Sequence, residues 1–300
     1  MPPKLTGIRL RKFAILLIVL FFCIWGIWFV VIPKSLIADY IVESFGDRGV
    51  NVVIAGLKKG FLGTVHIERA IIGPQPHRRT PFSAEKNIQY QSSSYENRRQ
   101  KEGVQGLVVQ KIDIAPDLLS FLKLSPRLNF SGRAGKGVIR GFIVGKWRGV
   151  TVNVEAADLQ VSDLAFFENA GISGEGTLSF NLEWRNEKGN LKFSIDSAKL
   201  RGHLPGINSL PMELFQSVKG LIGIGELITV HPLTLEGPGL YVRVKGNIRE
   251  SNFDGRVELM LDSSSDSYNL LQTIMARYSQ SPGYYVIPDV HADLLSGSNL

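Results

Sequence analysis

Cysteine is almost absent from this chain, which has only Cys23 in 300 residues. Because Cys23 lies inside a long apolar run, the remainder of the chain can form neither a disulfide nor a thiolate metal site. Histidine is scarce and scattered, without H-E-x-x-H or any other paired spacing, which argues against a metal site. The five histidines are His66, His77, His203, His231 and His291. We therefore expect a fold held by packing alone, with no metal or cofactor.

Catalytic signatures are also lacking. The stretch GRAGKGVIRG, residues 132–141, lacks the G-x-x-x-x-G-K-[ST] spacing and leads into a strand, so it cannot place a helix N-terminus against a phosphate. No G-x-S-x-G elbow occurs, and Asp262 and Asp266 of DSSSDS are typical of a turn and a helix cap. The sequence favours a protein that is not an enzyme.

The positive charge is concentrated at the N-terminus. The formal net charge is +7, but four basic residues precede position 13, which leaves 30 basic and 27 acidic residues in the remainder. No strand-like stretch interleaves a run of lysine and arginine with aromatic residues, as a nucleic-acid surface would. We expect an ordinary, mildly basic surface and no nucleic-acid partner.

Residues 13–32, FAILLIVLFFCIWGIWFVVI, form an uncharged run of twenty. At about 1.5 Å of helical rise per residue such a run spans roughly 30 Å, the thickness of a hydrocarbon core. The sequence therefore predicts a single membrane-spanning helix, with tryptophans toward its far end where amphipathic rings prefer the interface. The expected anchor residues are Phe13, Leu16, Leu17, Leu20, Trp25, Trp28 and Ile32.

The charges flanking this run predict its orientation. Four basic residues precede it and only Lys34 and Arg48 follow it closely, so the N-terminus, residues 1–12, is expected inside and the bulk of the chain outside. A cleaved signal peptide is the alternative, but the apolar run is long for one and no A-x-A-like site follows it promptly. The expected topology-setting charges are Lys4, Arg9, Arg11 and Lys12.

Residues 34–49, KSLIADYIVESFGDRG, read as an amphipathic helix with acidic residues opposite its apolar side. The helix could be a lid on the first strands or could lie on the membrane surface. Its acidic face disfavours anionic headgroups, so we favour the lid. The expected apolar face is Leu36, Ile37, Tyr40, Ile41 and Phe45.

From residue 50 the apolar period changes to two, as in GTLSFNLEW, residues 176–184. Three units of glycine, strand, polar turn and strand predict an antiparallel meander, with one hairpin turned at residues 186–189. The residues expected on its apolar face, as core or as a groove, are Val150, Val152, Val154, Leu178, Phe180, Leu182, Trp184, Leu240, Val242, Val244, Val257, Leu259 and Leu261.

Residues 74–103 interrupt this pattern with prolines, serines and almost no aliphatic side chains, so we expect a long, mobile, basic insertion in the β domain of residues 50–300. A solvated loop is the simpler interpretation, and docking to an acidic partner or to lipid phosphate is the alternative. The basic residues that would dock are Arg78, Arg79, Arg98, Arg99 and Lys101.

Few helices accompany the strands. Helical spacing occurs in residues 211–220 and 266–278, besides one or two turns after Pro116. These cannot cover the apolar side of about a dozen strands. The expected fold is therefore mainly β: a transmembrane helix, then a large curved antiparallel sheet that closes as a sandwich or half-barrel or leaves an open groove for acyl chains or for a partner's strand.

The layout resembles known envelope proteins. The basic start, the single apolar run, the amphipathic helix and VNVVIAGLKKGFLGTVHIERAIIG resemble the opening of AsmA-like proteins. APDLLSFLKLSPRLNFSGRAGKGVIRGFIV, LRGHLPGINSLPMELFQSVKGLIGIGELITVHPLTLEGPGLYVRVKGNI and GRVELMLDSSSDSYNLL are similar to the type II secretion system protein N family, GspN. The likeness covers nearly the whole chain, but the insertion is longer than expected and VHADLLSGSNL lacks the closing glycine-strand-proline phrase.

The resemblance implies a bacterial inner-membrane protein whose periplasmic β domain serves type II protein secretion through contacts with other envelope proteins of that system. The alternative, also implied by the AsmA-like likeness, is a lipid-binding or lipid-transfer protein whose apolar face shelters phospholipid acyl chains.

Overall fold

The structure is a computed structural model of the chain. The structure describes residues 19, 26, 28, 31–46, 50–74, 106–122, 124–147, 149–164, 167, 172–204, 207–249, 252–263 and 268–293. Fourteen strands form one antiparallel sheet in the order β1-β2-β3-β4-β5-β6-β7-β8-β11-β12-β13-β14-β16-β15. The prediction of a mainly β protein with a large antiparallel sheet is confirmed. Most of the expected membrane segment and of the insertion lies outside the described residues.

Nearly every strand of the sheet pairs with its neighbours in the sequence. Only β9 and β10 leave the order, because they form a separate two-stranded sheet. The strands are β1(Val50–Lys59), β2(Val65–Pro74), β3(Leu107–Asp117), β4(Arg127–Ala134), β5(Gly137–Lys146), β6(Gly149–Gln160), β7(Ser173–Arg185), β8(Lys188–Arg201), β9(His203–Leu204), β10(Ile207–Pro211), β11(Ser217–Ile224), β12(Ile228–Gly237), β13(Leu240–Arg249), β14(Asn252–Leu261), β15(Ser279–Ser281) and β16(Tyr284–Asp293).

The described helices are short. They are α2(Lys34–Gly46), α4(Leu118–Leu122) and α6(Tyr268–Met275), with 3₁₀ turns η2(Phe61–Gly63), η3(Val161–Asp163), η4(Met212–Leu214) and η5(Ala276–Tyr278). The helical patterns of residues 34–49 and 266–278 are thus confirmed by α2 and by α6 with η5. The helix predicted over residues 211–220 is wrong. Only η4 is helical there, because the following residues pair as β11 with both β8 and β12.

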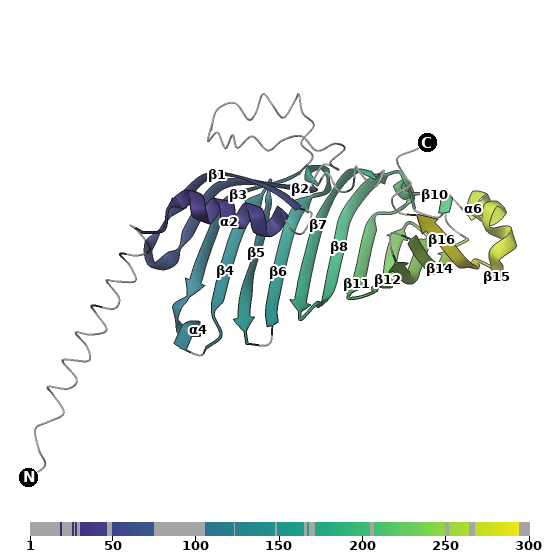
Figure 1. Cartoon of the computed structure of the whole chain (residues 1–300). Helices are drawn as coiled ribbons and strands as arrows, with labels where there is room; N and C mark the ends of the chain where they lie inside the picture. The colour runs from purple at the N-terminus through teal and green to yellow at the C-terminus, as the bar shows by residue number, and fades with distance from the viewer. Residues whose placement is uncertain are drawn as a thin grey trace, which may run out of the picture.

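The sheet is open. In Figure 1 strands β4–β8 stand side by side, whereas β1–β3 run across their upper ends, so the strand direction changes sharply after β3. β1 and β15 are the two outer strands. The expected alternative of two stacked sheets is therefore not what the described strands form, because each large strand extends the same sheet instead of facing it.

Because the sheet is a meander, its connections alternate between the two opposite ends of its strands. We call the two sides of the sheet formed by these strand ends its two edges, as distinct from its outer strands. One edge carries the β1–β2, β3–β4, β5–β6, β7–β8 and β11–β12 connections, which are short; we call it the short-turn edge. The opposite edge carries the β6–β7, β8–β11 and β14–β16 connections, which contain η3, then β9, β10 and η4, then α6 and η5; we call it the long-connection edge. The two edges therefore differ in how much chain is available to cover the sheet.

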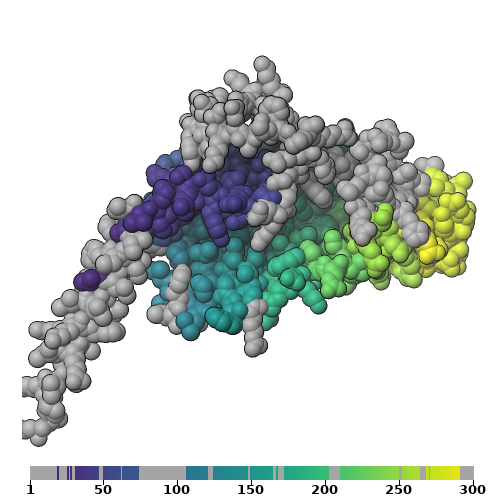
Figure 2. All heavy atoms as spheres, viewed as in Figure 1, coloured from purple at the N-terminus to yellow at the C-terminus, as the bar shows by residue number. Residues whose placement is uncertain are grey.

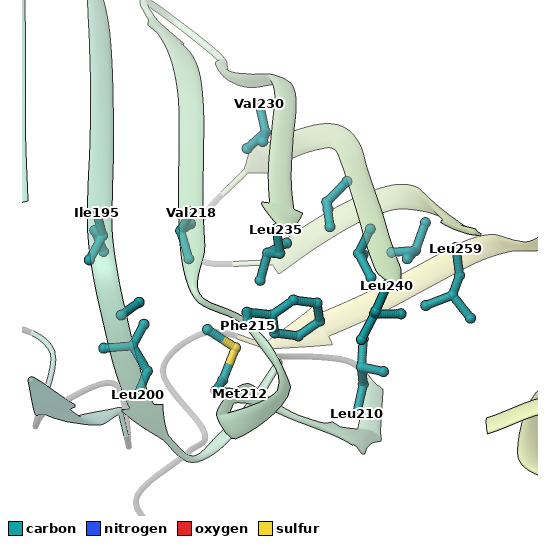
Figure 3. Packing of buried hydrophobic residues seen from close by; sticks show 14 of the residues in the cluster. Ile195, Leu200, Leu210, Met212, Phe215, Val218, Val230, Leu235, Leu240 and Leu259 are labelled. Atoms are coloured by element: carbon teal, nitrogen blue, oxygen red, sulfur yellow. The ribbon is translucent and has the colours of Figure 1, made fainter. Parts of the chain in front are cut away.

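The core lies at the long-connection edge. One row of paired residues crosses eight strands there without a gap, and every member is buried: Leu159, Leu178, Ile195, Val218, Leu235, Val242, Leu259 and Tyr285. Figure 3 shows Met212 and Phe215, from the β8–β11 connection, beside Leu235 and Leu240 of this core. The connections of this edge thus cover the apolar face of the sheet, as a second sheet does in a β-sandwich.

Helix α2 covers the other end of the sheet. Trp28, Ile37 and Ile41 pack against a small cluster formed by Val65, Ile67 and Ala70 of β2, as expected of a lid on the first strands. In Figure 2 the purple helix lies on the outside of the molecule. The expected apolar face of this helix is wrong in part, since Leu36, Tyr40 and Phe45 are exposed. Leu36 and Tyr40 are each one residue, about 100° of helical rotation, from the side that Ile37 and Ile41 turn to the sheet, and Phe45 lies in the last turn of the helix.

Phe215→Ala should lower the free energy of unfolding of the full chain in detergent by about 3–5 kcal/mol, because the ring is fully buried and its loss leaves a cavity. Chemical denaturation measures the effect. Leu221→Ala is the matched control, since that side chain is exposed on β11, and it should change stability by less than about 1 kcal/mol. Equal effects of the two substitutions would contradict this account of the core.

Candidate functional site

The apolar face of the sheet is only half covered near the short-turn edge. Its side chains there are partly buried or exposed and belong to neither buried cluster of the described residues. Leu128, Ile143 and Val150 are the most exposed. We call this surface the apolar strip, and its members are Leu128, Phe130, Ile143, Val150, Val152, Val154, Leu182, Trp184, Leu191, Ile222 and Ile224.

Strand register places the apolar strip on one face. Paired residues of adjacent strands project to the same side of a sheet, and residues two apart in a strand do so as well. The first row runs Leu128, Ile143, Val152, Trp184, Gly189 and Ile224. The second runs Phe130, Gly141, Val154, Leu182, Leu191 and Ile222. Both cross β4, β5, β6, β7, β8 and β11 without a polar interruption, over about 24 Å at ~4.8 Å per strand.

Two glycines flatten the apolar strip. A Cβ atom on Gly141 would lie 2.7 Å from Cζ of Phe130, and one on Gly189 would lie 2.7 Å from Cε3 of Trp184. Each ring therefore occupies the space that a side chain on the neighbouring strand would need. The result is a smooth, continuous apolar surface, which suits a long flexible chain better than a compact polar ligand.

The residues expected on the apolar face divide into two sets. Seven are core: Leu178, Leu240, Val242, Val244, Val257, Leu259 and Leu261 are buried. Five belong to the apolar strip: Val150, Val152, Val154, Leu182 and Trp184. Phe180 lies between the sets, partly buried and packed on the core. The alternation in NLKFSID places Leu191 of β8 on the same side as Phe193 and Ile195, whereas the residues of the apolar strip on β4, β5 and β11 were not singled out from the sequence.

The opposite face of the sheet is polar. Asn153, Glu183, Asn190 and Thr229 occupy one of its rows, and the amide of Asn181 donates a hydrogen bond to Glu155 Oε1 over 3.3 Å. A hollow of about 920 Å³ lies near the β7–β8 and β11–β12 turns, and its lining combines residues of this face with Val152, Trp184, Gly189 and Ile224 of the first apolar row. Its charged lining residues, which are Glu183, Arg185, Lys188, Glu226 and His231, are all exposed, so solvent weakens their fields.

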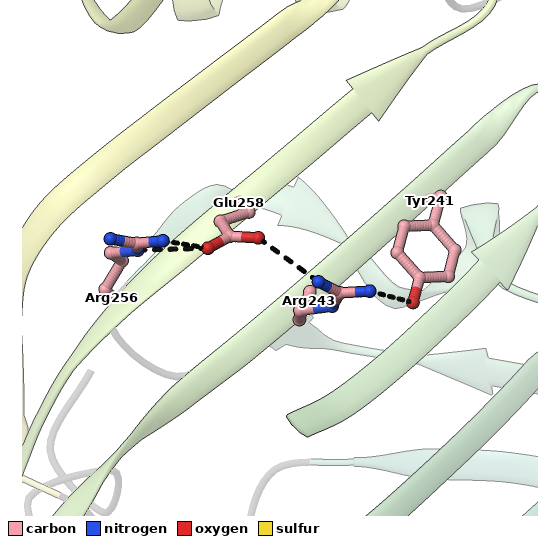
Figure 4. A network of polar contacts seen from close by, with 4 residues as sticks. All are labelled: Tyr241, Arg243, Arg256 and Glu258. Carbon is pink, nitrogen blue, oxygen red and sulfur yellow. Dashed lines mark hydrogen bonds and ion pairs between the residues drawn. The ribbon is translucent and has the colours of Figure 1, made fainter. Parts of the chain in front are cut away.

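Among the described residues, one buried charged side chain lies on the polar face, and no sequence pattern indicated it. Figure 4 shows Glu258 of β14 between Arg256 of the same strand and Arg243 of β13. Arg256 Nε donates to Glu258 Oε1 over 3.1 Å, and Arg243 Nη1 lies 3.7 Å from Oε2. Arg243 in turn donates to the hydroxyl of Tyr241 over 3.3 Å.

Hydrogen bonds from Arg256 hold the pKa of Glu258 below its ordinary value, against the opposing effect of burial. The same pair raises the pKa of Arg256, and the bond to Tyr241 raises that of Arg243. These shifts favour the charged forms of Glu258, Arg256 and Arg243. The network pins β13 to β14 on the side away from the core, which is a structural role.

The remaining expected features have separate outcomes. Among the described residues no group of three or more histidine, cysteine, aspartate or glutamate side chains could hold a metal ion; His66 Nδ1 contacts Asp113 Oδ1 at 2.5 Å as an exposed pair. Within the same part of the chain, no helix has both the length and the apolar character to cross a bilayer. Lys4, Arg9, Arg11, Lys12, most of residues 13–32 and the basic residues Arg78, Arg79, Arg98, Arg99 and Lys101 lie outside the described residues.

Comparison with known proteins gives no relative: no protein-family model, curated protein or solved structure matches the chain.

Glu258→Gln should lower stability by about 1–3 kcal/mol at pH 7, because it removes a charge-assisted bond to Arg256 from a buried position. Since the pKa of Glu258 is depressed on folding, its contribution is present above its ordinary value of about 4.3 and is lost as the pH falls through the lower folded-state pKa. The stability gap between variant and wild type should therefore close in acid.

Chemical denaturation from pH 7 to pH 3 measures this closure. Glu155→Gln is the control, because Glu155 is exposed and its neutralisation should matter little at any pH. A gap for Glu258→Gln that stays constant across this range would show that the carboxylate charge is not the source of the effect.

Proposed function

We propose that this protein is a membrane-anchored, non-enzymatic β scaffold of the bacterial envelope that shelters phospholipid acyl chains on the apolar strip. The single observation that carries the proposal is the pair of uninterrupted apolar rows across six strands, whose side chains are exposed or only partly buried. Each buried methylene contributes about 0.8 kcal/mol, so ten methylenes laid along the apolar strip contribute ~8 kcal/mol before the entropy cost. This value is relative to water, so it offsets the cost of removing the same methylenes from the hydrocarbon of the bilayer.

The anchor belongs to the same proposal. The uncharged run of residues 13–32 is long enough to span a bilayer, and basic residues gather before it. We therefore place the N-terminus in the cytoplasm, the span in the inner membrane and the sheet in the periplasm. The resemblance to AsmA-like envelope proteins supports the same arrangement.

Phospholipid carrying a diazirine on its acyl chain tests the lipid proposal in membranes that contain the full chain. After illumination, mass spectrometry should find cross-links on the apolar strip, at positions such as Val154, Leu182 and Leu191. The polar face of the same strands is the internal control, and Asn153, Asn181 and Lys192 should carry few. Cross-links confined to residues 13–32 would mean that lipid only surrounds the anchor, and the proposal would fail.

A matched pair of variants extends this test. Leu182→Glu with Leu191→Glu places two charges on the apolar strip, at paired positions of β7 and β8. Asn181→Glu with Asn190→Glu places the same charges on the polar face of the same strands. We expect the first pair to lose most lipid cross-linking and the second to keep it. Equal yields of lipid cross-links from the two double variants would contradict the assignment of lipid binding to the apolar face.

A second candidate function is participation in type II protein secretion, to which the GspN likeness points. The observation that favours it is the outer position of β1, a ten-residue strand with one neighbour, β2, in the sheet order. An unpaired strand edge of this length can accept a strand from a partner. A photo-cross-linking residue at Asn51 should then capture a pseudopilus or platform protein. If no pseudopilus or platform protein is captured and lipid is found on the apolar strip, the secretion proposal fails and the lipid proposal stands.

A further inference from the structure

The large apolar side chains of highest exposure have an uneven distribution. Among the described residues, those more than half exposed lie either before the sheet or in the connections of the short-turn edge. The first group is Val19, Val31, Leu36 and Tyr40; the second is Phe61, Leu119, Leu124 and Trp147. Trp147 is 101% exposed and Leu124 is 89% exposed. Among the described residues of the long-connection edge, by contrast, no large apolar side chain is more than half exposed.

The end of the proposed membrane span is held against this same edge. Lys59, the last residue of β1, donates hydrogen bonds of 2.5 Å to the carbonyl oxygens of Trp28 and Ile32. The indole nitrogen of Trp28 donates to the carbonyl of Gly60 over 3.1 Å, and the Lys59 ammonium lies 5.4 Å from the indole ring centre. Phe61 follows directly in the β1–β2 connection. The exit of the chain from the bilayer is therefore adjacent to the first exposed ring.

The other exposed side chains continue along that edge. Leu119 lies in α4 and Leu124 just after it, in the β3–β4 connection, and Trp147 lies in the β5–β6 turn. In Figure 1 α4 and the β5–β6 turn both lie at the lower edge of the sheet. The β5–β6 turn and the β1–β2 connection belong to the same edge and are four strands apart in the sheet order.

We propose that the short-turn edge docks on the bilayer in which the chain is anchored, with Phe61, Leu124 and Trp147 inserted at the headgroup level. Tryptophan prefers this level because its ring is apolar and its N–H is polar. A leucine at an exposed loop tip gains the free energy of transfer from water to an apolar environment when it inserts into the bilayer. The inference rests on the proposed anchor, but not on lipid binding by the apolar strip.

Docking in this way has a consequence for the apolar strip. Its most exposed members, Leu128, Ile143 and Val150, lie within a few residues of the same connections. The open part of the apolar face therefore begins at the bilayer, and the buried row lies farthest from it. An acyl chain could pass from the membrane to the apolar strip without crossing water.

Site-directed spin labelling of the full chain in phosphatidylcholine nanodiscs tests the docking. In a Cys23→Ser background, labels at Leu124→Cys and Trp147→Cys should be more accessible to oxygen, which partitions into lipid, than to a water-soluble nickel complex. Lys136→Cys is the control, because Lys136 is exposed in the β4–β5 turn at the opposite edge and should show the reverse order. All three replace exposed residues, so the fold should be unaffected.

The native cysteine separates the two ways in which the inference can fail. A label on Cys23 in the unmodified chain should be inaccessible to the nickel complex if the span is in the bilayer. If Cys23 is protected while positions 124 and 147 are as accessible to nickel as position 136, the docking is wrong and the anchor stands; a protein partner for this edge would then be the better account. If Cys23 is itself accessible to nickel, the anchor and the docking both fall.

Discussion

Burial of one face of a single sheet without a second sheet is the constraint on which this structure depends. A fourteen-stranded meander has an apolar face too large for the three short helices of the described residues to cover, and unburied apolar surface contributes nothing to stability. The chain meets the constraint at one edge only. Three long connections fold back over the row from Leu159 to Tyr285 and close it, and this single closed row joins eight strands into one unit. Within the described residues, the connections of the opposite edge contribute no side chain to this buried cluster.

The open region follows from the same asymmetry. Along β7 the inward side chains pass from buried Leu178, through Phe180, to the partly exposed Leu182 and Trp184. The strand itself keeps one alternation throughout; what changes is the distance from the connections that cover it. Stability is therefore concentrated at the long-connection edge, and the apolar strip can remain available to a ligand without weakening the core. A site built in this way on rigid strands is preformed, which lowers the entropy cost of binding.

The alternation of apolar residues in the sequence predicted those parts of the fold that depend on interactions between neighbouring residues. The alternation of GTLSFNLEW and of Val242 with Val244 identified the inward faces, and Asn186 with Glu187 form the expected hairpin turn in the left-handed conformation that a tight turn requires. The pattern could not show which half of a face is covered, because that depends on connections distant in the sequence. It also predicted a helix at residues 211–220, where Met212 and Phe215 instead turn under the core and β11 pairs on both sides. Glu258 alternates like any outward residue, and only the pairing of β13 with β14 brings Arg243 to it.

The direction in which a lipid would move on this scaffold can be argued from the register. The two rows of the apolar strip run across the strands, from β4 to β11, and not along them. Movement along a strand, away from the short-turn edge, leads within a few residues into the closed row of Leu178 and Ile195, which has no room for a guest. A bound acyl chain is thus confined to a band parallel to the short-turn edge, with α2 covering the first strands at one end of the sheet. On a bilayer docked at that edge, the band lies parallel to the membrane surface. Such a geometry suits holding a lipid beside the membrane more than carrying it away, and transfer across the periplasm would require a second surface that continues from β11.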